Sequence, residues 1–213
     1  MSIKNKQRIP VNIRQGVTYF PNALSPKEQR ALLKDIEHIL IHAPLFKPRM
    51  PRTGKPFSVQ MSNCGDLGWV SDKEQGYRYE PTHPETGEPW PSIPDQLLKL
   101  WIQLTDYNSP PEACLINHYI DKARMGLHTD DDENEPNAPI LSLSLGDDAW
   151  FRIGGLKRND PTTRLKLKSG DIICLSGPAR FIYHGIDRIL PGTSSLVKNG
   201  GRINLTLRRV NPK

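Results

Sequence analysis

The 213-residue sequence has little cysteine, no long apolar run and no internal repeat. No segment approaches the roughly 20 apolar residues that a membrane-spanning helix needs. The first ten residues carry charge but no apolar stretch, which argues against a secretory signal. Three cysteines without a CxxC pair argue against a disulfide framework and favour a reducing cytoplasm. We expect Cys114 and Cys174, which lie in apolar runs, to be buried thiols.

The chain is long enough for one large domain with a sizeable core, and its formal net charge is +6. A basic balance favours polyanionic partners such as nucleic acid, although many basic proteins never bind one. Nothing in the sequence demands an obligate protein partner, a membrane or an assembly larger than a monomer.

The first 110 residues contain two predicted helices. Ser25 and Glu28 form a capping box around Pro26, and apolar residues at helical spacing extend the first helix over 26–42. His38 and His42 lie four apart there, but histidines near a helix C-terminus are explained by the helix dipole. The second helix is predicted over 94–104. We expect its core face to carry Leu97, Leu98, Trp101 and Ile102.

Between the helices lies a long segment rich in glycine, proline and aromatic residues, including NCGDLGW and QGYRYEP. A connection of this length in a compact domain is usually functional, often a lid or a binding surface. From Ala113 onward, about seven short alternating runs are separated by turn signals such as Ser169-Gly170-Asp171. This pattern indicates a β-barrel or sandwich, and we favour a jelly roll because such folds carry metal sites inside.

The chemistry begins with His128 and Asp130 in the run GLHTDDDE, followed far downstream by His184 in RFIYHG. On an extended strand, residues i and i+2 face the same side, so His128 and Asp130 can reach one metal. Two histidines and one carboxylate hold non-haem Fe(II) and leave positions open for oxygen and a cosubstrate. The alternative is that HxD is a chance pair and His184 a core histidine.

The final strand, RINLTLRR, has an aliphatic face and a polar face. The polar face carries Arg202, Asn204, Thr206 and Arg208. It either faces solvent or lines a cavity that holds an anion. Arginine suits the second role, because its planar guanidinium can donate two parallel hydrogen bonds to a carboxylate. In ACLINHYI, Asn117 and Tyr119 share one face and can add hydrogen bonds to the same ligand. His118 has the opposite parity and is left out of the site.

In this order, LINHYIDKARMGLHTDDDE, LSLSLG, FRIGGLKRNDP, FIYHGI and RINLTLR resemble the AlkB-type Fe(II)/2-oxoglutarate dioxygenases. NCGDLGW and QGYRYEP resemble the nucleotide-recognition lid of the bacterial members. The resemblance covers roughly residues 58–209. It implies a mainly β fold with flanking helices and a double-stranded β-helix (jelly-roll) core. Residues 1–110 would hold the N-terminal helices and the lid, and residues 111–213 the catalytic core, together forming one compact unit.

The resemblance also implies a role for each matching residue. The catalytic iron ligands would be His128, Asp130 and His184. The 2-oxoglutarate ligands would be Asn117, Tyr119, Arg202, Asn204 and Arg208, the two arginines neutralising its carboxylates. Substrate would contact Trp69, Tyr77, Asp132 and Arg158, with Trp69 stacking on a flipped base. Each substrate residue has an alternative: Trp69 can equally be a core aromatic, although it lies beside a glycine in a loop, and Tyr77 can simply cover the barrel mouth. Asp132 can be one of a solvated acidic run, and without the resemblance Arg158 is a solvated turn charge.

The implied activity is oxidative dealkylation of bases such as 1-methyladenine and 3-methylcytosine in DNA, with RNA as a further candidate. Fe(II) would be the cofactor, 2-oxoglutarate and O2 would be consumed, and succinate, CO2 and an aldehyde would be released. A hydroxylase of a protein or small metabolite is the alternative, and a nucleic-acid-binding module with a vestigial site is a third. Two positions depart from the pattern. Asp131 stands where close relatives place a lysine and would repel a phosphate, and Leu175 stands where a tryptophan would narrow the pocket.

Overall fold

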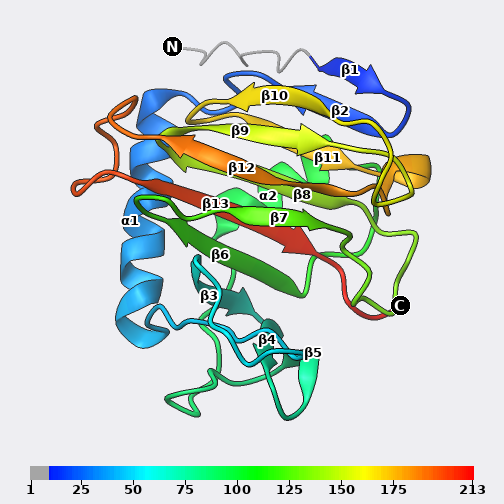
Figure 1. Cartoon of the computed structure of the whole chain (residues 1–213). Coiled ribbons are helices and arrows are strands. Elements are labelled where there is room, and N and C mark those ends of the chain that lie inside the picture. The colour runs from blue at the N-terminus through cyan, green and yellow to red at the C-terminus, as the bar shows by residue number, and fades with distance from the viewer. Residues whose placement is uncertain (1–9) are drawn as a thin grey trace.

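Two antiparallel β-sheets face each other in the computed structural model, which describes residues 10–213 (Figure 1). The larger sheet has the order β1 (Val11–Arg14), β2 (Val17–Phe20), β11 (Ile172–Leu175), β8 (Ile140–Gly146), β13 (Arg202–Arg208), β6 (Ala113–Tyr119) and β3 (Gln60–Gly65). The smaller has the order β10 (Thr163–Leu167), β9 (Asp148–Ile153), β12 (His184–Leu190) and β7 (Met125–His128). The predicted mainly β jelly roll with flanking helices is confirmed.

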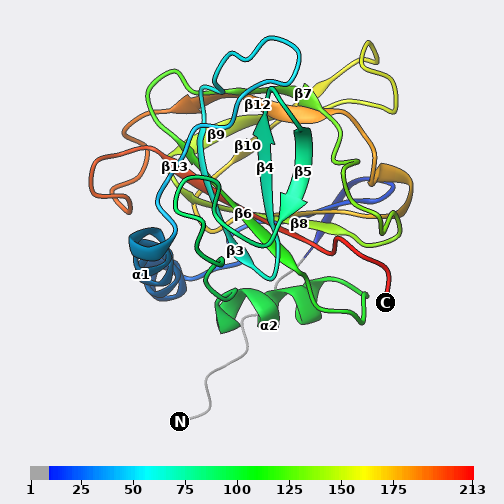
Figure 2. The same cartoon turned by 90° about the horizontal axis from the view of Figure 1, so that it is seen from below.

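The two helices lie on the side of the large sheet that faces away from the small sheet (Figure 2). Helix α1 (Pro26–His42) begins at the predicted capping box: the Ser25 Oγ accepts from the Glu28 amide at 3.3 Å, and the Glu28 carboxylate accepts from the Ser25 amide at 2.7 Å. Its predicted bounds are confirmed, because capping chemistry and apolar spacing both act locally. A short 3₁₀ helix, η1 (Gly177–Ala179), precedes β12.

Helix α2 (Asp95–Leu104) starts one residue after Pro94 and buries Leu97, Leu100 and Trp101. The prediction that Ile102 faces the core was wrong, since its side chain is 73% exposed. The buried set has the spacing i, i+3 and i+4, which defines one face of a helix, whereas Ile102 lies one position round the helix from Trp101. A run of apolar residues at 97–102 concealed which of them form the stripe.

The segment between the helices contributes β3 to the large sheet and then a hairpin, β4 (Gly68–Asp72) and β5 (Gly76–Glu80). This lid hairpin lies across one end of the sandwich, as Figure 2 shows from below. Strands from both sides of residue 110 therefore share the large sheet, and the division of the chain at that point stays a prediction. No helix in residues 10–213 is long and apolar enough to cross a membrane.

The interior of the sandwich is closed by the side chains of the central strands. In β13, Ile203, Leu205 and Leu207 are at most 5% exposed. Their polar neighbours Arg202 and Arg208 are also buried, at 1% and 6%. Since neither face of this strand reaches solvent, the solvated alternative for its polar face is wrong, and the buried charges require partners. The cysteines are free and buried, as predicted for Cys114 and Cys174.

Candidate active site

A pocket of about 170 Å³ opens between the two sheets beneath the lid hairpin. Its walls come from the inner faces of β6, β8 and β13 on one side and of β7, β9 and β12 on the other, with aromatic side chains of the hairpin at the mouth. Every site residue predicted from the sequence lines this pocket except Arg158. The alternation of side chains along the strands brings together residues that are up to 139 positions apart, from Trp69 to Arg208.

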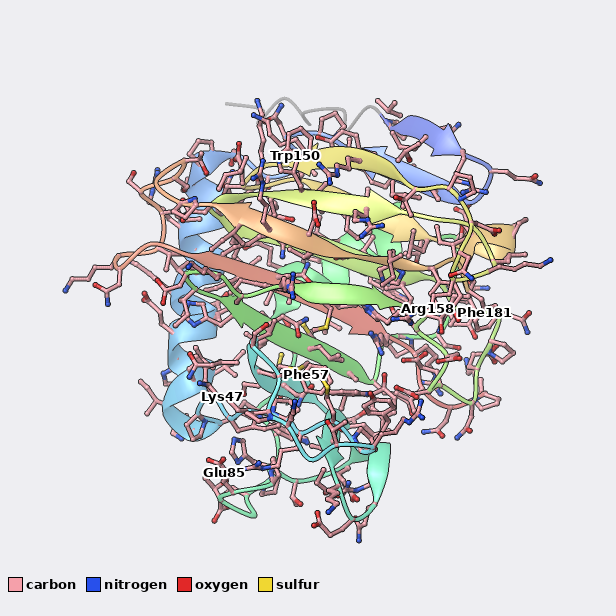
Figure 3. All side chains as sticks on the ribbon, in the orientation of Figure 1. Lys47, Phe57, Glu85, Trp150, Arg158 and Phe181 are labelled. Atoms are coloured by element: carbon pink, nitrogen blue, oxygen red, sulfur yellow. The ribbon has the colours of Figure 1, made fainter. Side chains whose placement is uncertain are left out.

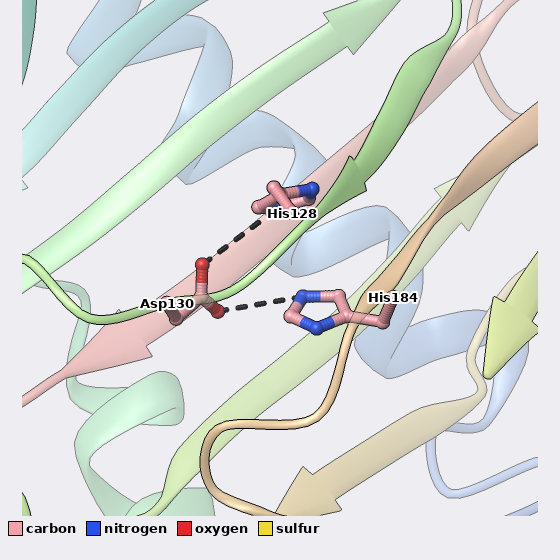
Figure 4. Close-up of side chains that lie close together, drawn as sticks. All are labelled: His128, Asp130 and His184. Atoms are coloured by element: carbon pink, nitrogen blue, oxygen red, sulfur yellow. Dashed lines mark ion pairs between the residues drawn. The ribbon is translucent and has the colours of Figure 1, made fainter. Parts of the chain in front are cut away.

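His128, Asp130 and His184 lie together within the pocket (Figure 4). β7 ends at His128, β12 begins at His184, and the two residues are paired across the strands. Asp130 follows in the loop, with its Oδ1 3.6 Å from His128 Nε2 and its Oδ2 3.5 Å from His184 Nε2. The potential ligand atoms all lie within 4.8 Å of one another. Neighbouring ligands of an octahedral metal are about 3 Å apart when bonds are about 2.1 Å long.

The histidine rings are oriented by backbone carbonyls. His128 Nδ1 lies 2.9 Å from the Gly126 oxygen and His184 Nδ1 lies 3.1 Å from the Ile182 oxygen. A proton on each Nδ1 leaves the Nε2 lone pairs directed at the same point as the Asp130 carboxylate, which is the arrangement of metal-bound histidines. Gly185 permits this, because a Cβ there would lie 2.6 Å from the Met125 oxygen and push β7 away.

The protonation states suit metal binding. Burial within the pocket, followed by the nearby His184, lowers the pKa of His128 to about 4, so its ring is neutral at physiological pH. Burial alone would raise the pKa of Asp130, but Arg208 and His184 outweigh it and hold that pKa well below the usual range. A neutral imidazole and an ionised carboxylate are the ligand forms that a divalent transition metal needs. This donor set fits Fe(II).

The two arginines of β13 have different surroundings. Arg208 Nη2 donates to Asp130 Oδ1 at 2.6 Å, and Nη1 donates to Glu133 Oε1 at 2.7 Å. Two carboxylates therefore neutralise Arg208, and only its buried Nε lacks a partner. The sequence placed both arginines on one face but gave no sign of this difference. One ion-pair partner is the candidate metal ligand Asp130, and the other is Glu133, which follows three aspartates in the sequence.

Arg202 has no carboxylate partner among residues 10–213, although its side chain is fully enclosed. Its Nη2 donates to Ser144 Oγ at 3.0 Å and its guanidinium carbon lies 5.2 Å from the centre of the Tyr119 ring. Nε and Nη1 are buried without partners, as is Asn117 Oδ1 nearby. An unpaired buried cation is costly unless an anion joins it. The residues present therefore fit a carboxylate ligand such as 2-oxoglutarate.

The mouth of the pocket is aromatic. The rings of Trp69 and Tyr77 stack with centroids 5.4 Å apart and an interplanar angle of 27°. Trp69 Nε1 donates to Asp132 Oδ2 at 2.7 Å, which fixes the indole against the loop that follows Asp130. Phe57 packs edge-on against the same indole with centroids 6.2 Å apart. Tyr77 is 49% exposed whereas Trp69 is only 8% exposed, so the open aromatic surface at the entrance is mainly that of Tyr77.

Arg158 lies outside this group. It is exposed in the loop between β9 and β10, with its guanidinium carbon 5.8 Å from the centre of the Tyr183 ring. Figure 3 shows it toward the edge of the molecule.

The departures from the family pattern are both in the pocket: Asp131 is exposed at its rim and Leu175 is buried in its wall. The rings of His38 and His42 contact each other, with centroids 5.2 Å apart, and neither residue lines the pocket.

Comparison with known proteins agrees with this geometry. The model of the 2OG-Fe(II) oxygenase superfamily matches residues 16–208. The chain is 54% identical over 200 residues to the alpha-ketoglutarate-dependent dioxygenase AlkB homolog of Caulobacter vibrioides, covering 94% of this chain and 90% of that protein. It is 42% identical over 186 residues to Escherichia coli AlkB, covering 85% of each. The solved structure of OsALKBH1 superposes with a TM-score of 0.77 at 28% identity, covering 94% of this chain and all of that one.

The protein is thus an oxygenase that uses Fe(II), 2-oxoglutarate and O2. Within that superfamily, the chain belongs to the AlkB-type dioxygenases, as the sequence resemblance predicted.

Proposed function

We propose that this protein removes N-linked alkyl groups from bases of DNA, and of RNA as a second substrate, by oxidation. The observation that carries the proposal is the coincidence of three features in one pocket: a metal-binding set, a buried unpaired arginine and an aromatic mouth. The names of relatives point the same way, since one from Arabidopsis thaliana, 27% identical, is described as a DNA N(6)-methyladenine demethylase.

In this proposal His128, Asp130 and His184 hold Fe(II). Arg202 binds a carboxylate of 2-oxoglutarate through its free donors, assisted by Asn117, Tyr119 and Asn204. Arg208 offers its unpaired Nε to 2-oxoglutarate, while its Nη2 orients the Asp130 carboxylate. The bound iron, with 2-oxoglutarate and O2, supplies the oxidation that adds an oxygen atom to the N-alkyl carbon, with release of succinate and CO2. The resulting hemiaminal collapses to an aldehyde and the restored base.

The protein's own residues select and hold the substrate. A base must leave its stack to reach the pocket, and an alkylated base that pairs poorly leaves at lower cost. The Trp69–Tyr77 surface offers it a stacking partner, which is worth about 1–3 kcal/mol per base. Asp132 holds the indole of Trp69 in place. Arg158, exposed beyond the pocket, is placed in this proposal against the nucleic acid flanking the target base.

The proposal includes a monomer acting in the reducing cytoplasm. The three cysteines are free thiols, which supports a reducing compartment.

A single-turnover experiment tests the proposed function. The protein is loaded anaerobically with Fe(II) and 2-oxoglutarate, and O2 is then added with an oligonucleotide that contains 1-methyladenine. We expect succinate and repaired adenine in equal amounts. Succinate without repaired base would favour hydroxylation of a protein or small metabolite. The absence of both succinate and repaired base would refute the assignment.

A further inference from the structure

Behind the metal-binding set lies a closed group of charged side chains, two of which, Glu133 and Arg180, have no part in the proposed chemistry. The buried ion network consists of Asp130, Glu133, Arg180 and Arg208. Arg180 Nη2 donates to Glu133 Oε2 at 2.8 Å, and Arg208 bridges Glu133 and Asp130 at 2.7 and 2.6 Å. The side chains of all four are at most 7% exposed. Two cations and two anions thus balance one another out of contact with water.

Arg180 fixes the loop that carries the metal ligand. Its Nη1 donates to the backbone oxygen of Asp130, and its Nε donates to the backbone oxygen of Ala138 at 2.8 Å. The Asp130 residue is therefore held twice, through its backbone by Arg180 and through its carboxylate by Arg208. Hydrogen-bonded partners of this kind set the orientation of a metal ligand and influence metal affinity.

The lid hairpin reaches into this network through Tyr79 of β5. The Tyr79 hydroxyl donates to Glu133 Oε1 and accepts from Arg208 Nη1 at 3.0 Å. Tyr79 is directly opposite Trp69 in the hairpin register, and Tyr77, two positions earlier, stacks on Trp69. Tyr77 and Tyr79 share one face of β5. One face of a two-stranded hairpin thus carries both the aromatic surface at the pocket mouth and a hydroxyl bonded to the network behind the metal ligand.

We propose that Tyr79 is a positioning residue that couples the lid hairpin to the metal ligand Asp130 through Arg208 and Glu133. The inference rests on the proposed function. When a base stacks on the aromatic surface and fixes the position of the hairpin, Tyr79 holds Arg208 against Asp130. When the hairpin is displaced, Arg208 loses its hydrogen bond to Tyr79 and keeps only Glu133 and Asp130 as partners. The arrangement links cosubstrate turnover to the presence of a base in the pocket. By reciprocity, metal binding strengthens oligonucleotide binding by the same factor as the oligonucleotide strengthens metal binding.

The test compares the wild-type protein with Tyr79→Phe, which keeps the ring and removes only the hydroxyl. Mn(II) with 2-oxoglutarate serves as a ligand pair that binds without turnover. Affinity for an oligonucleotide containing 1-methyladenine is measured with and without that pair. We expect the pair to strengthen binding about fivefold or more in the wild type, at the lower end of typical coupling factors. In Tyr79→Phe we expect a factor close to one, with affinity in the absence of metal unchanged within about twofold.

Tyr19→Phe is the matched control, because it also removes a tyrosine–carboxylate hydrogen bond. The Tyr19 hydroxyl donates to Asp171 Oδ2 at 2.7 Å in β2, and Tyr19 is not part of the pocket wall. This variant should keep the wild-type coupling factor. A second readout needs no nucleic acid: the rate of tryptic cleavage after Lys73, exposed in the hairpin turn. Mn(II) with 2-oxoglutarate should slow this cleavage in the wild type and in Tyr19→Phe, but not in Tyr79→Phe.

Turnover gives a third comparison. Tyr79→Phe should form at least about twice as much succinate per repaired base as the wild type, because the metal site no longer senses the hairpin. Equal metal effects on affinity and on cleavage in the wild type and Tyr79→Phe would overturn the coupling. That result is distinct from failure of the proposed function, in which the wild type itself repairs no base. In that case the cleavage readout alone decides whether Tyr79 links hairpin and metal site.

Discussion

Arg202 offers the sharpest test of the site, because replacing it should strengthen the fold while removing cosubstrate binding. Burial lowers the pKa of its guanidinium, which reports the cost of enclosing that charge. Arg202→Met fills a similar volume without charge. The variant loses the hydrogen bond to Ser144, worth about 1 kcal/mol, and the contact with the Tyr119 ring, worth about 0.5–2 kcal/mol. It also removes an uncompensated buried charge, for which even paired examples gain about 1–4 kcal/mol on apolar replacement.

Because Arg202 is unpaired, its gain should lie at the upper end of that range, about 4 kcal/mol, so the balance favours the variant by about 1–2.5 kcal/mol, a melting temperature about 2–10 °C higher for the metal-free protein. Arg180→Met is the matched control, since Arg180 is equally buried but paired with Glu133 at 2.8 Å. Arg180→Met leaves Glu133 Oε2 without its charged donor while Arg208 still binds Oε1, and this loss of one partner in a buried network should cost about 3–5 kcal/mol, or about 6–20 °C. Thermal melts in the presence of a chelator measure both variants.

The same substitution, Arg202→Met, should weaken the binding of 2-oxoglutarate although it stabilises the metal-free fold. Losing the charge-assisted donors of Arg202 should weaken 2-oxoglutarate binding by about 2–5 kcal/mol, roughly 30-fold or more, as measured by calorimetry with Mn(II) present. In the wild type, 2-oxoglutarate should raise the melting temperature, and in Arg202→Met it should not. The reasoning fails if Arg202→Met destabilises the metal-free protein as strongly as Arg180→Met does, because Arg202 would then have a partner of its own.

Three further predictions concern the metal ligand, the pocket rim and pH. His128→Ala should abolish turnover while oligonucleotide affinity without metal and circular dichroism stay unchanged; loss of folding would show that the histidine is structural. Asp131→Lys should strengthen oligonucleotide binding at low salt and steepen the plot of log K against log salt by about 0.7–0.9; an unchanged slope would remove that position from the interface. Burial alone would raise the pKa of Glu133, but Arg208, the Tyr79 hydroxyl and Arg180 together outweigh it and lower that pKa. The ionised Glu133 therefore stabilises the folded protein fully above its ordinary pKa of 4.5, and this stabilisation is lost as the pH falls through the lower pKa of the folded state. Thermal melts in that acidic range should show a smaller loss of stability for Glu133→Gln than for the wild type.

Much of the site followed from the sequence because its signals are local or periodic. The capping box fixed the start of α1, and strand parity assigned Asn117 and Tyr119 to the pocket and His118 to the other side. The pairing of His128 with His184 across β7 and β12 was beyond local signals. Ligand chemistry suggested that the three residues meet, and the order of motifs in a known family supported it, but strand pairing over 56 residues depends on the whole sheet.

The buried ion network could not be predicted, for the same physical reason. Arg180 directly follows η1 and Glu133 follows three aspartates, and neither pattern predicts a buried ion pair. Their burial is decided by long-range packing, over 47 positions from Glu133 to Arg180 and 75 to Arg208. The one available signal was in β5, where Tyr77 and Tyr79 share a face. If Tyr77 is assigned to the pocket mouth, parity directs Tyr79 inward as well.

The difference between the two arginines of β13 then explains why a single strand serves both cofactors. At one end, Arg202 has donors but no internal acceptor, so its charge is satisfied only when an anionic ligand arrives. At the other end, two carboxylates bind both Nη atoms of Arg208, one of them the candidate metal ligand Asp130, and only its Nε has no partner. An arginine reserved for a ligand must stay underpaired at some cost to stability, whereas an arginine that orients a ligand must itself be held by ion pairs to be rigid. The same residue type on the same face therefore performs two opposite tasks, and its partners distinguish them.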